Sequence, residues 1–442
     1  MKIKVPFARK ANVKITATLL FLYATLTIQA QDFLYGDALP DAPKLAERGD
    51  YTVGVRTLNL VHKDQVDILN SKEGKDPMYD RPLTIEVWYP SEAPANKTTT
   101  VSYEEVMGTR GDSLRPLVPF SFKGRAYRDA SVKANEGGYP LIVVSHGYVG
   151  SRYLMTYLTE NLASKGYVVV SIDHTDSTFK DANAFQSTLL NRAKDIKFVI
   201  HTIAEKGGSS SEDQLSGMVD SENIGIVGYS MGGYGVLNVG GAGYSDGMTA
   251  FFGQMTGGST AISALAASNA EYQKQIDPRI KAIVAFAPWG MERGVWDATG
   301  LAGLKKPTLF VAGDQDDISG YEKGIKAIYE GAVNADRYLL TYKNARHNVA
   351  PNPPPAEALQ PGLHIDEYYR YAEPSWDQRK INNINQHFLT AFLGTHLKDA
   401  DYAEYLDVPV ESNEKDWNGF KPRSSTGMQL MHAKAAEANM KQ

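Results

Sequence analysis

Short, nearly uninterrupted apolar runs that are rich in β-branched residues recur through the middle of the chain. Strands buried on both faces have this composition, and they form parallel sheets that helices cover. Segments with a helical spacing of apolar positions separate the runs, for example at residues 154–165, 189–205 and 320–329. This alternation predicts right-handed crossovers and an α/β fold with a mostly parallel central sheet flanked by helices. The predicted buried strands are residues 139–145, 167–172, 223–228, 280–287, 307–312 and 337–342.

The region before these runs has a different character. Residues 51–61 and 83–89 alternate partly between apolar and polar positions, which predicts antiparallel strands with one face in water. Residues 91–133 are rich in Pro, Gly, Ser and charge and show no sustained period, so we expect a long surface excursion there. We treat residues 31–138 as the N-terminal part of one α/β domain that spans residues 31–398.

Later segments also interrupt the alternation of strand and helix. Residues 240–268 are loaded with Gly, Ala, Ser and Thr, which predicts a flexible insertion, with residues 240–278 as a candidate lid. Residues 345–379 contain proline and aromatic clusters and should wrap the surface near the end of a strand. A final helix at 381–396 would close the sheet, and the tail, residues 399–442, has no clear period.

The first thirty residues have the composition of a secretory signal peptide. Lysine and arginine precede an uncharged apolar stretch at residues 15–28, and the small residue Ala30 follows it. The apolar stretch has about 14 residues, which is short of the roughly 20 that a membrane-spanning helix needs. We therefore predict cleavage after Ala30, a secreted or periplasmic protein and no stable membrane anchor.

Composition excludes several classes of function. The chain has 46 Lys and Arg against 51 Asp and Glu, a net charge of −5, so it lacks the basic footprint of a nucleic-acid-binding protein. It contains no cysteine, which excludes disulfides, thiolate zinc sites and a cysteine nucleophile. The pattern carries no signal for an oligomeric state.

A G-x-S-x-G motif follows directly after the predicted strand at 223–228. It reads Gly228-Tyr229-Ser230-Met231-Gly232, and a segment compatible with a helix begins at Met231. A sharp turn from strand to helix forces strained backbone angles on the serine, and flanking glycines let neighbouring elements approach. The hydroxyl of Ser230 would then stand above the sheet edge as a nucleophile, beside a helix N-terminus that favours negative charge.

A serine on such a turn needs a histidine and an acid later in the chain, each in a loop after a strand. Of the nine histidines, this order excludes those before Ser230. His347 follows the predicted strand at 337–342 and is our candidate base, with His364 as the fallback. For the acid, the strand at 307–312 ends in a turn with three aspartates, Asp314, Asp316 and Asp317, any of which could orient the imidazole.

The same turn does not suit a metal ion. Ile318 and Ser319 stand where a calcium-binding loop needs a ligand and a glycine, so we expect no metal site. The chemistry of a serine nucleophile with a histidine base also needs no organic cofactor.

An anionic tetrahedral intermediate requires two backbone N–H donors. One comes from the residue after the nucleophile and the other from the loop after the first buried parallel strand. That loop begins Ser145-His146-Gly147-Tyr148, and Gly147 would let the chain turn so that the next amide faces the site. The predicted donors are the N–H groups of Tyr148 and Met231.

Taken in order, the motifs HGYVGSR, GYSMGG, GDQDDI and RHNVAP resemble the α/β-hydrolase superfamily. The nearest branches are the platelet-activating-factor acetylhydrolases, the bacterial cutinases and polyester hydrolases, and the predicted dienelactone hydrolases. The resemblance covers roughly residues 139–350. Dienelactone hydrolases proper use a cysteine nucleophile, and that chemistry cannot be carried over to a chain without cysteine.

The resemblance implies further roles. In polyester hydrolases the acid is the second aspartate of a similar turn, which corresponds to Asp316. Aromatic residues that flank the substrate in that branch correspond to Tyr148 and Trp289. Tyr229 departs from the pattern, because polyester hydrolases often have histidine or tryptophan at that place.

These observations together predict a secreted serine hydrolase of carboxylic esters, acting through an acyl-enzyme intermediate. The expected substrates are short-chain acyl esters or aromatic and polyester-like esters, either small or polymeric. An acyltransferase or a peptidase on the same scaffold is the alternative, because both share the acyl-enzyme step. A non-catalytic secreted binding protein would be expected to lack one member of the triad, whereas all three positions are occupied here.

Overall fold

A large mixed sheet organises the computed structural model, which describes residues 33–94, 100–208 and 215–436. The sheet has the strand order β12-β11-β10-β9-β8-β6-β7-β2-β1-β5 within these residues. Its strands are β1 (Thr52–Val66), β2 (Met78–Ser91), β5 (Tyr127–Arg128), β6 (Tyr139–Ser145), β7 (Val168–Asp173), β8 (Val219–Tyr229), β9 (Ile280–Phe286), β10 (Thr308–Gly313), β11 (Arg337–Tyr342) and β12 (Met428–Ala433).

The central strands of this sheet are parallel, as the apolar runs predict. Each neighbouring pair from β7 through β6, β8, β9 and β10 to β11 runs in the same direction. Every residue of β6 is buried, and so is every residue of β10, which explains why their sequences show no alternation. The strands β1, β2 and β12 are antiparallel additions at the two sides. The predicted α/β class is therefore confirmed.

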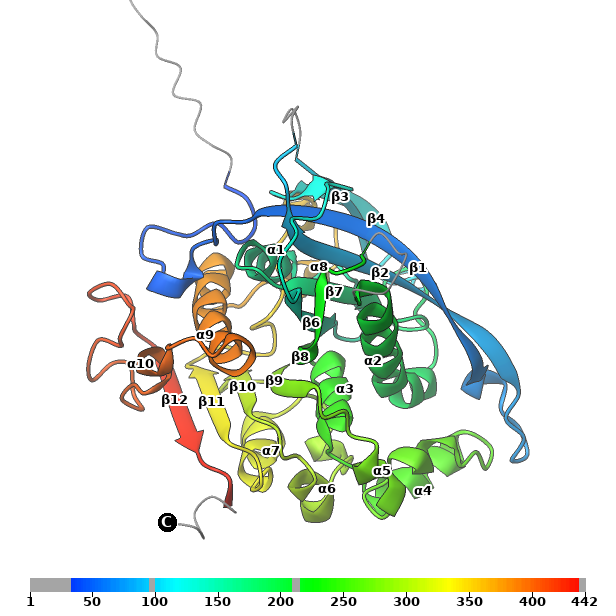
Figure 1. Ribbon diagram of the computed structural model, residues 1–442. Coiled ribbons are helices and arrows are strands. Elements are labelled where there is room, and N and C mark those ends of the chain that lie inside the picture. Colours follow the sequence, from blue (N-terminus) through cyan, green and yellow to red (C-terminus); the bar gives the residue numbers. More distant parts are fainter. Residues whose placement is uncertain (1–32, 95–99, 209–214, 437–442) are drawn as a thin grey trace, which may run out of the picture. The chain divides into compact units, whose positions relative to one another are not determined.

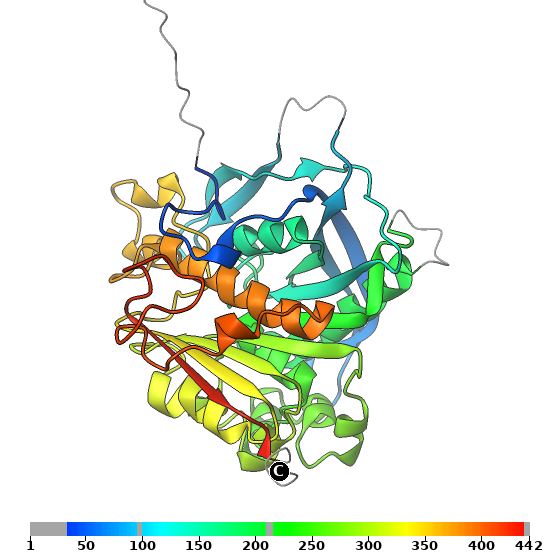
Figure 2. The same cartoon turned by 60° about the vertical axis from the view of Figure 1, so that its left-hand side comes forward.

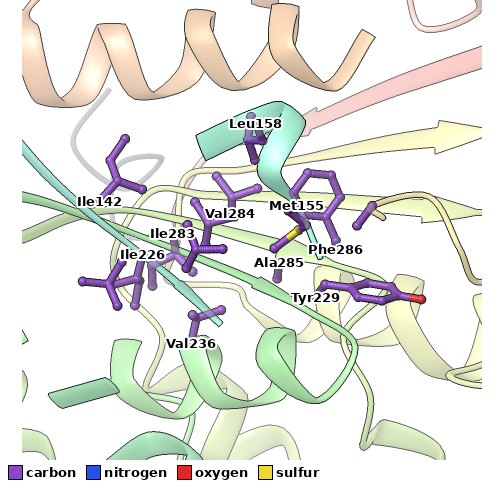
Figure 3. Packing of buried hydrophobic residues seen from close by; sticks show 14 of the residues in the cluster. Ile142, Met155, Leu158, Ile226, Tyr229, Val236, Ile283, Val284, Ala285 and Phe286 are labelled. Atoms are coloured by element: carbon purple, nitrogen blue, oxygen red, sulfur yellow. The ribbon is translucent and has the colours of Figure 1, made fainter. Parts of the chain in front are cut away.

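Helices cover both faces of the sheet (Figures 1 and 2). On one face α1 packs on β7 and β2, and α9 crosses β8 and β9; on the other, α2 and α3 pack on β6 and β8. Figure 3 shows Leu158 of α1 and Val236 of α3 on opposite sides of the strands that carry Ile226, Ile283 and Val284. The helices are α1 (Thr156–Ser164), α2 (Phe185–Gly207), α3 (Met231–Gly240), α4 (Asp246–Met255), α5 (Ala270–Lys274), α6 (Ala298–Ala302), α7 (Lys326–Gly331), α8 (Ile365–Tyr369), α9 (Gln378–Lys398) and α10 (Ala403–Leu406).

The excursion at residues 91–133 is more ordered than its sequence pattern indicates. It contains a two-stranded antiparallel sheet of β3 (Ser102–Met107) and β4 (Val118–Lys123). Tyr103 of β3 is fully buried, accepts a hydrogen bond from Trp88 Nε1 at 2.7 Å and donates one to Glu160 at 2.8 Å. Six-residue strands offer only three inward positions, too few for a clear period in the sequence.

The tail after Lys398 also adds to the fold, although its sequence shows no period. It supplies α10 and the edge strand β12, which pairs with β11 over six residues from Arg337↔Ala433 to Tyr342↔Met428. Only Met428 and Leu430 of β12 are buried, so the inward face of this edge strand carries little hydrophobic signal.

The predicted signal peptide, residues 1–30, lies outside the described residues. Within the described ranges, none of the helices has the length and apolar character of a bilayer span.

Candidate active site

The turn from β8 into α3 holds Ser230 in a backbone conformation that non-glycine residues rarely adopt. Its φ is 54° and its ψ is −113°, and its side chain is buried beside the start of the helix. The amide of Ser230 donates to Phe286 O at 2.8 Å, and the amide of Trp289 donates to Ser230 O at 3.2 Å. Backbone hydrogen bonds on both sides therefore hold the strained residue in place.

The glycines around Ser230 are required by contact with neighbouring backbone. A Cβ on Gly228 would lie 2.1 Å from Gly232 O, and a Cβ on Gly232 would lie 1.9 Å from Ser145 O. Both distances are far inside van der Waals contact. The turn therefore packs directly on the end of β6, where the loop with the predicted oxyanion donor begins.

The structure brings Ser230, His347 and Asp316 into one chain of hydrogen bonds. The Nε2 atom of His347 lies 2.9 Å from Ser230 Oγ, and its Nδ1 atom lies 2.8 Å from Asp316 Oδ2. A carboxylate can only accept here, so Nδ1–H donates to Asp316 and Nε2 is left to accept the hydroxyl proton. The loops after β8, β10 and β11 supply the three side chains, so all come from the carboxyl ends of parallel strands.

Asp316 is held as an anion. Burial opposes its ionisation, but the imidazole of His347 and two backbone N–H groups outweigh this and lower the pKa of Asp316. Its Oδ1 atom accepts from the amides of Ile318 and Ser319 at 2.9 and 2.8 Å. A charged carboxylate in this place fixes the imidazole tautomer and would stabilise an imidazolium.

The alternative residues for the acid and the base lie elsewhere. Asp314 accepts a hydrogen bond from the amide of Asn344 at 2.6 Å, and Asp317 pairs with Arg346. His364, the fallback base, is exposed and caps α8 by accepting from the amide of Asp366 at 3.3 Å. None of these hydrogen bonds joins the chain that contains Ser230.

The loop after β6 runs beside the serine. A Cβ on Gly147 would lie 3.3 Å from Ser230 Cβ, and Gly147, Tyr148 and Ser230 border the same cleft. Met231 is the first residue of α3, where helix N–H groups have no intrahelical acceptor. Tyr148 and Met231, which were predicted as oxyanion donors, thus lie next to Gly147 and Ser230 along the chain, and their role in catalysis stays a prediction.

A fully buried polar network, which the sequence analysis missed, supports this loop from behind. His174 bridges Ser145 Oγ, at 2.9 Å from its Nε2, and Asp195 Oδ2, at 3.0 Å from its Nδ1. Asp195 in turn accepts two hydrogen bonds from Arg81, at 2.9 and 3.0 Å. Burial opposes the charge on Asp195, yet Arg81 and His174 outweigh it and hold the pKa of Asp195 well below its usual range.

The neighbouring His146 extends the network into the oxyanion loop. Its Nε2 atom accepts from the amide of His174 at 3.2 Å, so its Nδ1–H donates to Gly147 O at 2.6 Å. Arg192 Nη1 donates to His146 O at 2.8 Å. His146 and His174 were excluded as catalytic by their order in the chain. They instead hold the backbone of the loop that contains the predicted donor Tyr148.

A cleft of about 820 Å³ opens above Ser230 and His347. Its other walls come from the β3–β4 connection, the residues after Asp316 and the segment between β11 and α9. Besides Ser230 and His347, the lining residues in chain order are Thr109, Asp112 and Arg115; Gly147, Tyr148, Val149 and Leu154; Phe179; Tyr229; Asp317 and Ile318; Arg346 and Asn348; and Asp366, Tyr369, Arg370, Ala372, Glu373 and Pro374.

The candidate lid at residues 240–278 does not border this cleft. Gly257 O accepts a hydrogen bond from the amide of Gly74 at 2.8 Å, and Ser259 Oγ donates to Asp76 at 2.8 Å. The insertion thus packs against the turn between β1 and β2. Its small residues allow close backbone contact there, a property that composition alone does not distinguish from flexibility.

The two predicted substrate-contacting aromatics differ in position. Tyr148 is 39% exposed and borders the cleft, with its hydroxyl donating to Asn183 O at 2.8 Å. Trp289 is absent from the described cleft lining and packs on the core. Phe185 lies between them, edge-on to Tyr148 at 5.3 Å and to Trp289 at 5.1 Å between ring centroids. Contact of Trp289 with a substrate stays a prediction.

Comparison with known proteins adds an independent line of evidence. A family model described as PETase, PET hydrolase-like, matches residues 124–245. Cutinase est1 of Thermobifida alba is 25% identical over 215 residues, which are 48% of this chain and 55% of that protein. The bis(hydroxyethyl) terephthalate hydrolase of Streptomyces coelicolor is 24% identical over 214 residues, 48% of this chain and 52% of that one. The chain thus matches about half the length of these curated relatives.

Among solved structures, the ferulic acid esterase from Streptomyces cinnamoneus is similar, with a TM-score of 0.53 and 19% identity. The match covers 86% of this chain and 96% of that chain. At this identity the likeness shows the fold, which is the α/β-hydrolase fold.

The buried network makes a prediction about pH. Burial, aided by the charge of Arg192, lowers the pKa of His174 to about 3. In the unfolded chain the pKa of an imidazole is about 6.5. The unfolded state therefore binds the extra proton between these values, and His174 removes about 1.4 kcal/mol of stability per pH unit as the pH falls below about 6.5. In His174→Gln this loss should vanish.

Urea unfolding between pH 7 and pH 4.5 checks this. We expect His174→Gln to be less stable than the wild type at pH 7, because its hydrogen bonds are lost, and to lose stability less steeply on acidification. An unchanged slope would mean that His174 is not buried in its neutral form.

Proposed function

We propose that this member of the α/β-hydrolase superfamily is a serine hydrolase of carboxylic esters, exported and acting through an acyl-enzyme intermediate. The observation that carries the proposal is the continuous hydrogen-bonded chain from Ser230 through His347 to Asp316, with Ser230 and His347 lining an open cleft. The similarity to cutinases and to a bis(hydroxyethyl) terephthalate hydrolase supports ester bonds as the target. The composition of residues 1–30 supports export.

The proposed reaction starts with attack of Ser230 Oγ on the ester carbonyl while His347 Nε2 takes the hydroxyl proton. Asp316 stabilises the resulting imidazolium, and the amides of Tyr148 and Met231 hold the tetrahedral oxyanion. Collapse of this intermediate transfers the proton from His347 to the leaving alcohol and leaves an acyl group on Ser230. Water, activated by His347, then attacks the acyl-enzyme and releases the acid.

The shape of the cleft bears on the substrate. Its lining mixes exposed apolar side chains, Tyr148, Ile318 and Tyr369, with further apolar residues and with arginines and acids. A lining in which charged and apolar side chains alternate offers no continuous apolar surface, which suits a short acyl chain or an aromatic ester better than a long alkyl chain. We therefore propose short-chain and aromatic or polyester-like esters as substrates.

The assignment of the acid can be tested against its neighbours in the same turn. We expect Ser230→Ala to lower kcat by about 10⁶-fold, and Asp316→Asn to lower it by about 10⁴-fold through loss of the correct imidazole tautomer. Asp314→Asn and Asp317→Asn are the matched controls and should stay within a few-fold of wild type. Hydrolysis of p-nitrophenyl acetate measures all four.

A different ranking would change the proposal in a defined way. If Asp314→Asn or Asp317→Asn were the damaging change, the acid would be misassigned. If Ser230→Ala kept the wild-type rate, the serine mechanism would be wrong. Added alcohol that diverts the product from free acid to a new ester would mark the chain as an acyltransferase.

The acyl specificity is a separate prediction. Across p-nitrophenyl esters from acetate to palmitate, we expect kcat/KM to be highest for short acyl chains and to fall as the chain outgrows the cleft. Ser230→Ala at each length gives the background rate. A maximum at palmitate would contradict this cleft as the acyl site.

A further inference from the structure

A second carboxylate, that of Glu373, binds the backbone of the loop that carries His347. Its Oε2 atom accepts a hydrogen bond from the amide of Arg346 at 2.6 Å, and its Oε1 atom accepts one from the amide of Asn348 at 2.5 Å. These are the backbone N–H groups on either side of His347. Glu373 is 5% exposed and borders the cleft. One side chain thus brackets the proposed catalytic base along the backbone.

Contacts just before the start of α9 hold Glu373 in place. Glu373 forms an antiparallel bridge with Trp376, whose Nε1–H donates to Lys343 O at 2.8 Å. The ring of Trp376 packs edge-on against Tyr342, the last residue of β11, with centroids 5.1 Å apart. The carboxylate is therefore held against the end of the strand from which the histidine loop departs.

The loop is also held from the side of the nucleophile. Tyr229 donates from its hydroxyl to Asn348 Oδ1 at 2.8 Å, and Gln378 donates to Asn348 O at 3.0 Å. Figure 3 shows the hydroxyl of Tyr229 turned away from the other labelled core side chains. The residue before Ser230 and the residue after His347 are thus joined directly.

The electrostatic surroundings of Glu373 follow from the same contacts. Burial raises the pKa of Glu373, and the nearby charge of Asp316 adds to this, while the two amides and His347 act in the opposite sense. The neighbouring side chain of Arg346 pairs with Asp317 instead. Two carboxylates, Asp316 by direct hydrogen bond and Glu373 from the loop backbone, therefore face one imidazole.

We infer that Glu373 is a positioning residue for His347: it fixes the backbone of the base and supplies a second negative charge that favours the imidazolium form. This inference rests on the proposed function, in which His347 takes the proton of Ser230. Glu373 does not touch Ser230 or the leaving group in this account. It acts through the two amides and through its field at the ring.

The test compares three variants. Glu373→Gln removes the charge and turns an N–H group of the amide toward one of the two backbone donors; Glu373→Asp keeps the charge on a shorter side chain. Glu160→Gln is the matched control, because Glu160 is also a buried carboxylate that accepts two consecutive backbone amides, those of Arg125 and Ala126, at 2.9 and 3.3 Å. Glu160 does not border the cleft above Ser230.

The first readout needs no catalysis. The ring signals of His347 are followed by NMR against pH, assigned by their loss in His347→Gln. In Glu373→Gln we expect the titration midpoint to move to lower pH, since an opposite charge near the ring has been removed. Glu373→Asp should restore most of the shift, and Glu160→Gln should leave the midpoint unchanged.

The second readout is hydrolysis of p-nitrophenyl acetate. We expect Glu373→Gln to lower kcat by about 10- to 100-fold, as for a misplaced catalytic group, with KM within about threefold of wild type. In the pH profile of kcat/KM, the acidic limb of Glu373→Gln should move in the same direction as the NMR titration midpoint of His347. Glu160→Gln should lower the melting temperature and leave kcat and the pH profile as in the wild type.

The outcomes separate this inference from the proposed function. An unchanged NMR midpoint in Glu373→Gln, or a loss of melting temperature with kcat unchanged, would overturn the positioning role. A shifted midpoint in a protein that hydrolyses no ester would uphold the role of Glu373 toward His347 and contradict the proposed function instead.

Discussion

The strained backbone of Ser230 is the constraint on which the rest of the site depends. A positive φ at a non-glycine residue costs of order 1–3 kcal/mol, and it persists only where the surroundings determine it fully. Here the surroundings are the parallel sheet: the Ser230 amide bonds to the end of β9, and the turn lies against the end of β6 with no room for a Cβ on Gly232. Relaxing this residue would move its hydroxyl away from His347 and separate the turn from the oxyanion loop.

Positions around that serine are fixed by groups that never meet a substrate. His174, Asp195 and Arg81 hold the loop after β6 from behind, and Glu373 holds the loop after β11 from the side. Both networks are buried. Hydrogen bonds in a buried network hold its side chains in one arrangement. Preorganisation of this kind is what lets fixed N–H groups stabilise a charge that develops during a reaction.

The sequence carries the information for the centre of the fold more fully than for its margins. Strands such as β6 and β10 have apolar side chains on both faces, because protein covers both faces. Their sequences are therefore recognisable as uninterrupted apolar runs. The motif around Ser230 and the order of residues after it pointed to Ser230, to His347 and to a turn with three aspartates, and the resemblance to polyester hydrolases selected Asp316. The structure brings these three side chains within hydrogen-bonding distance. By contrast β12 and β3 lie at edges, where few positions face inward, and their short patterns do not rise above the background.

Other features depend on long-range packing that no local pattern reports. The insertion at 240–278 has the composition of a lid, yet its glycines serve contact with the turn before β2. Glu373 lies in a proline- and aromatic-rich segment without a motif, and its importance appears only when the amides of Arg346 and Asn348 are seen beside it. Trp289 matches a family position, and its edge-on contact with Phe185 is likewise visible only in the structure.

The central claim is that Ser230 carries the acyl group during turnover. The most direct measurement is to mix the protein with p-nitrophenyl acetate, quench in acid within the first turnover, and locate the acetyl group by peptide mass spectrometry. The account predicts one acetyl group per chain on the peptide that contains Ser230, and none in Ser230→Ala. An acetyl group on another residue, or rapid hydrolysis with no acetylated peptide, would contradict it.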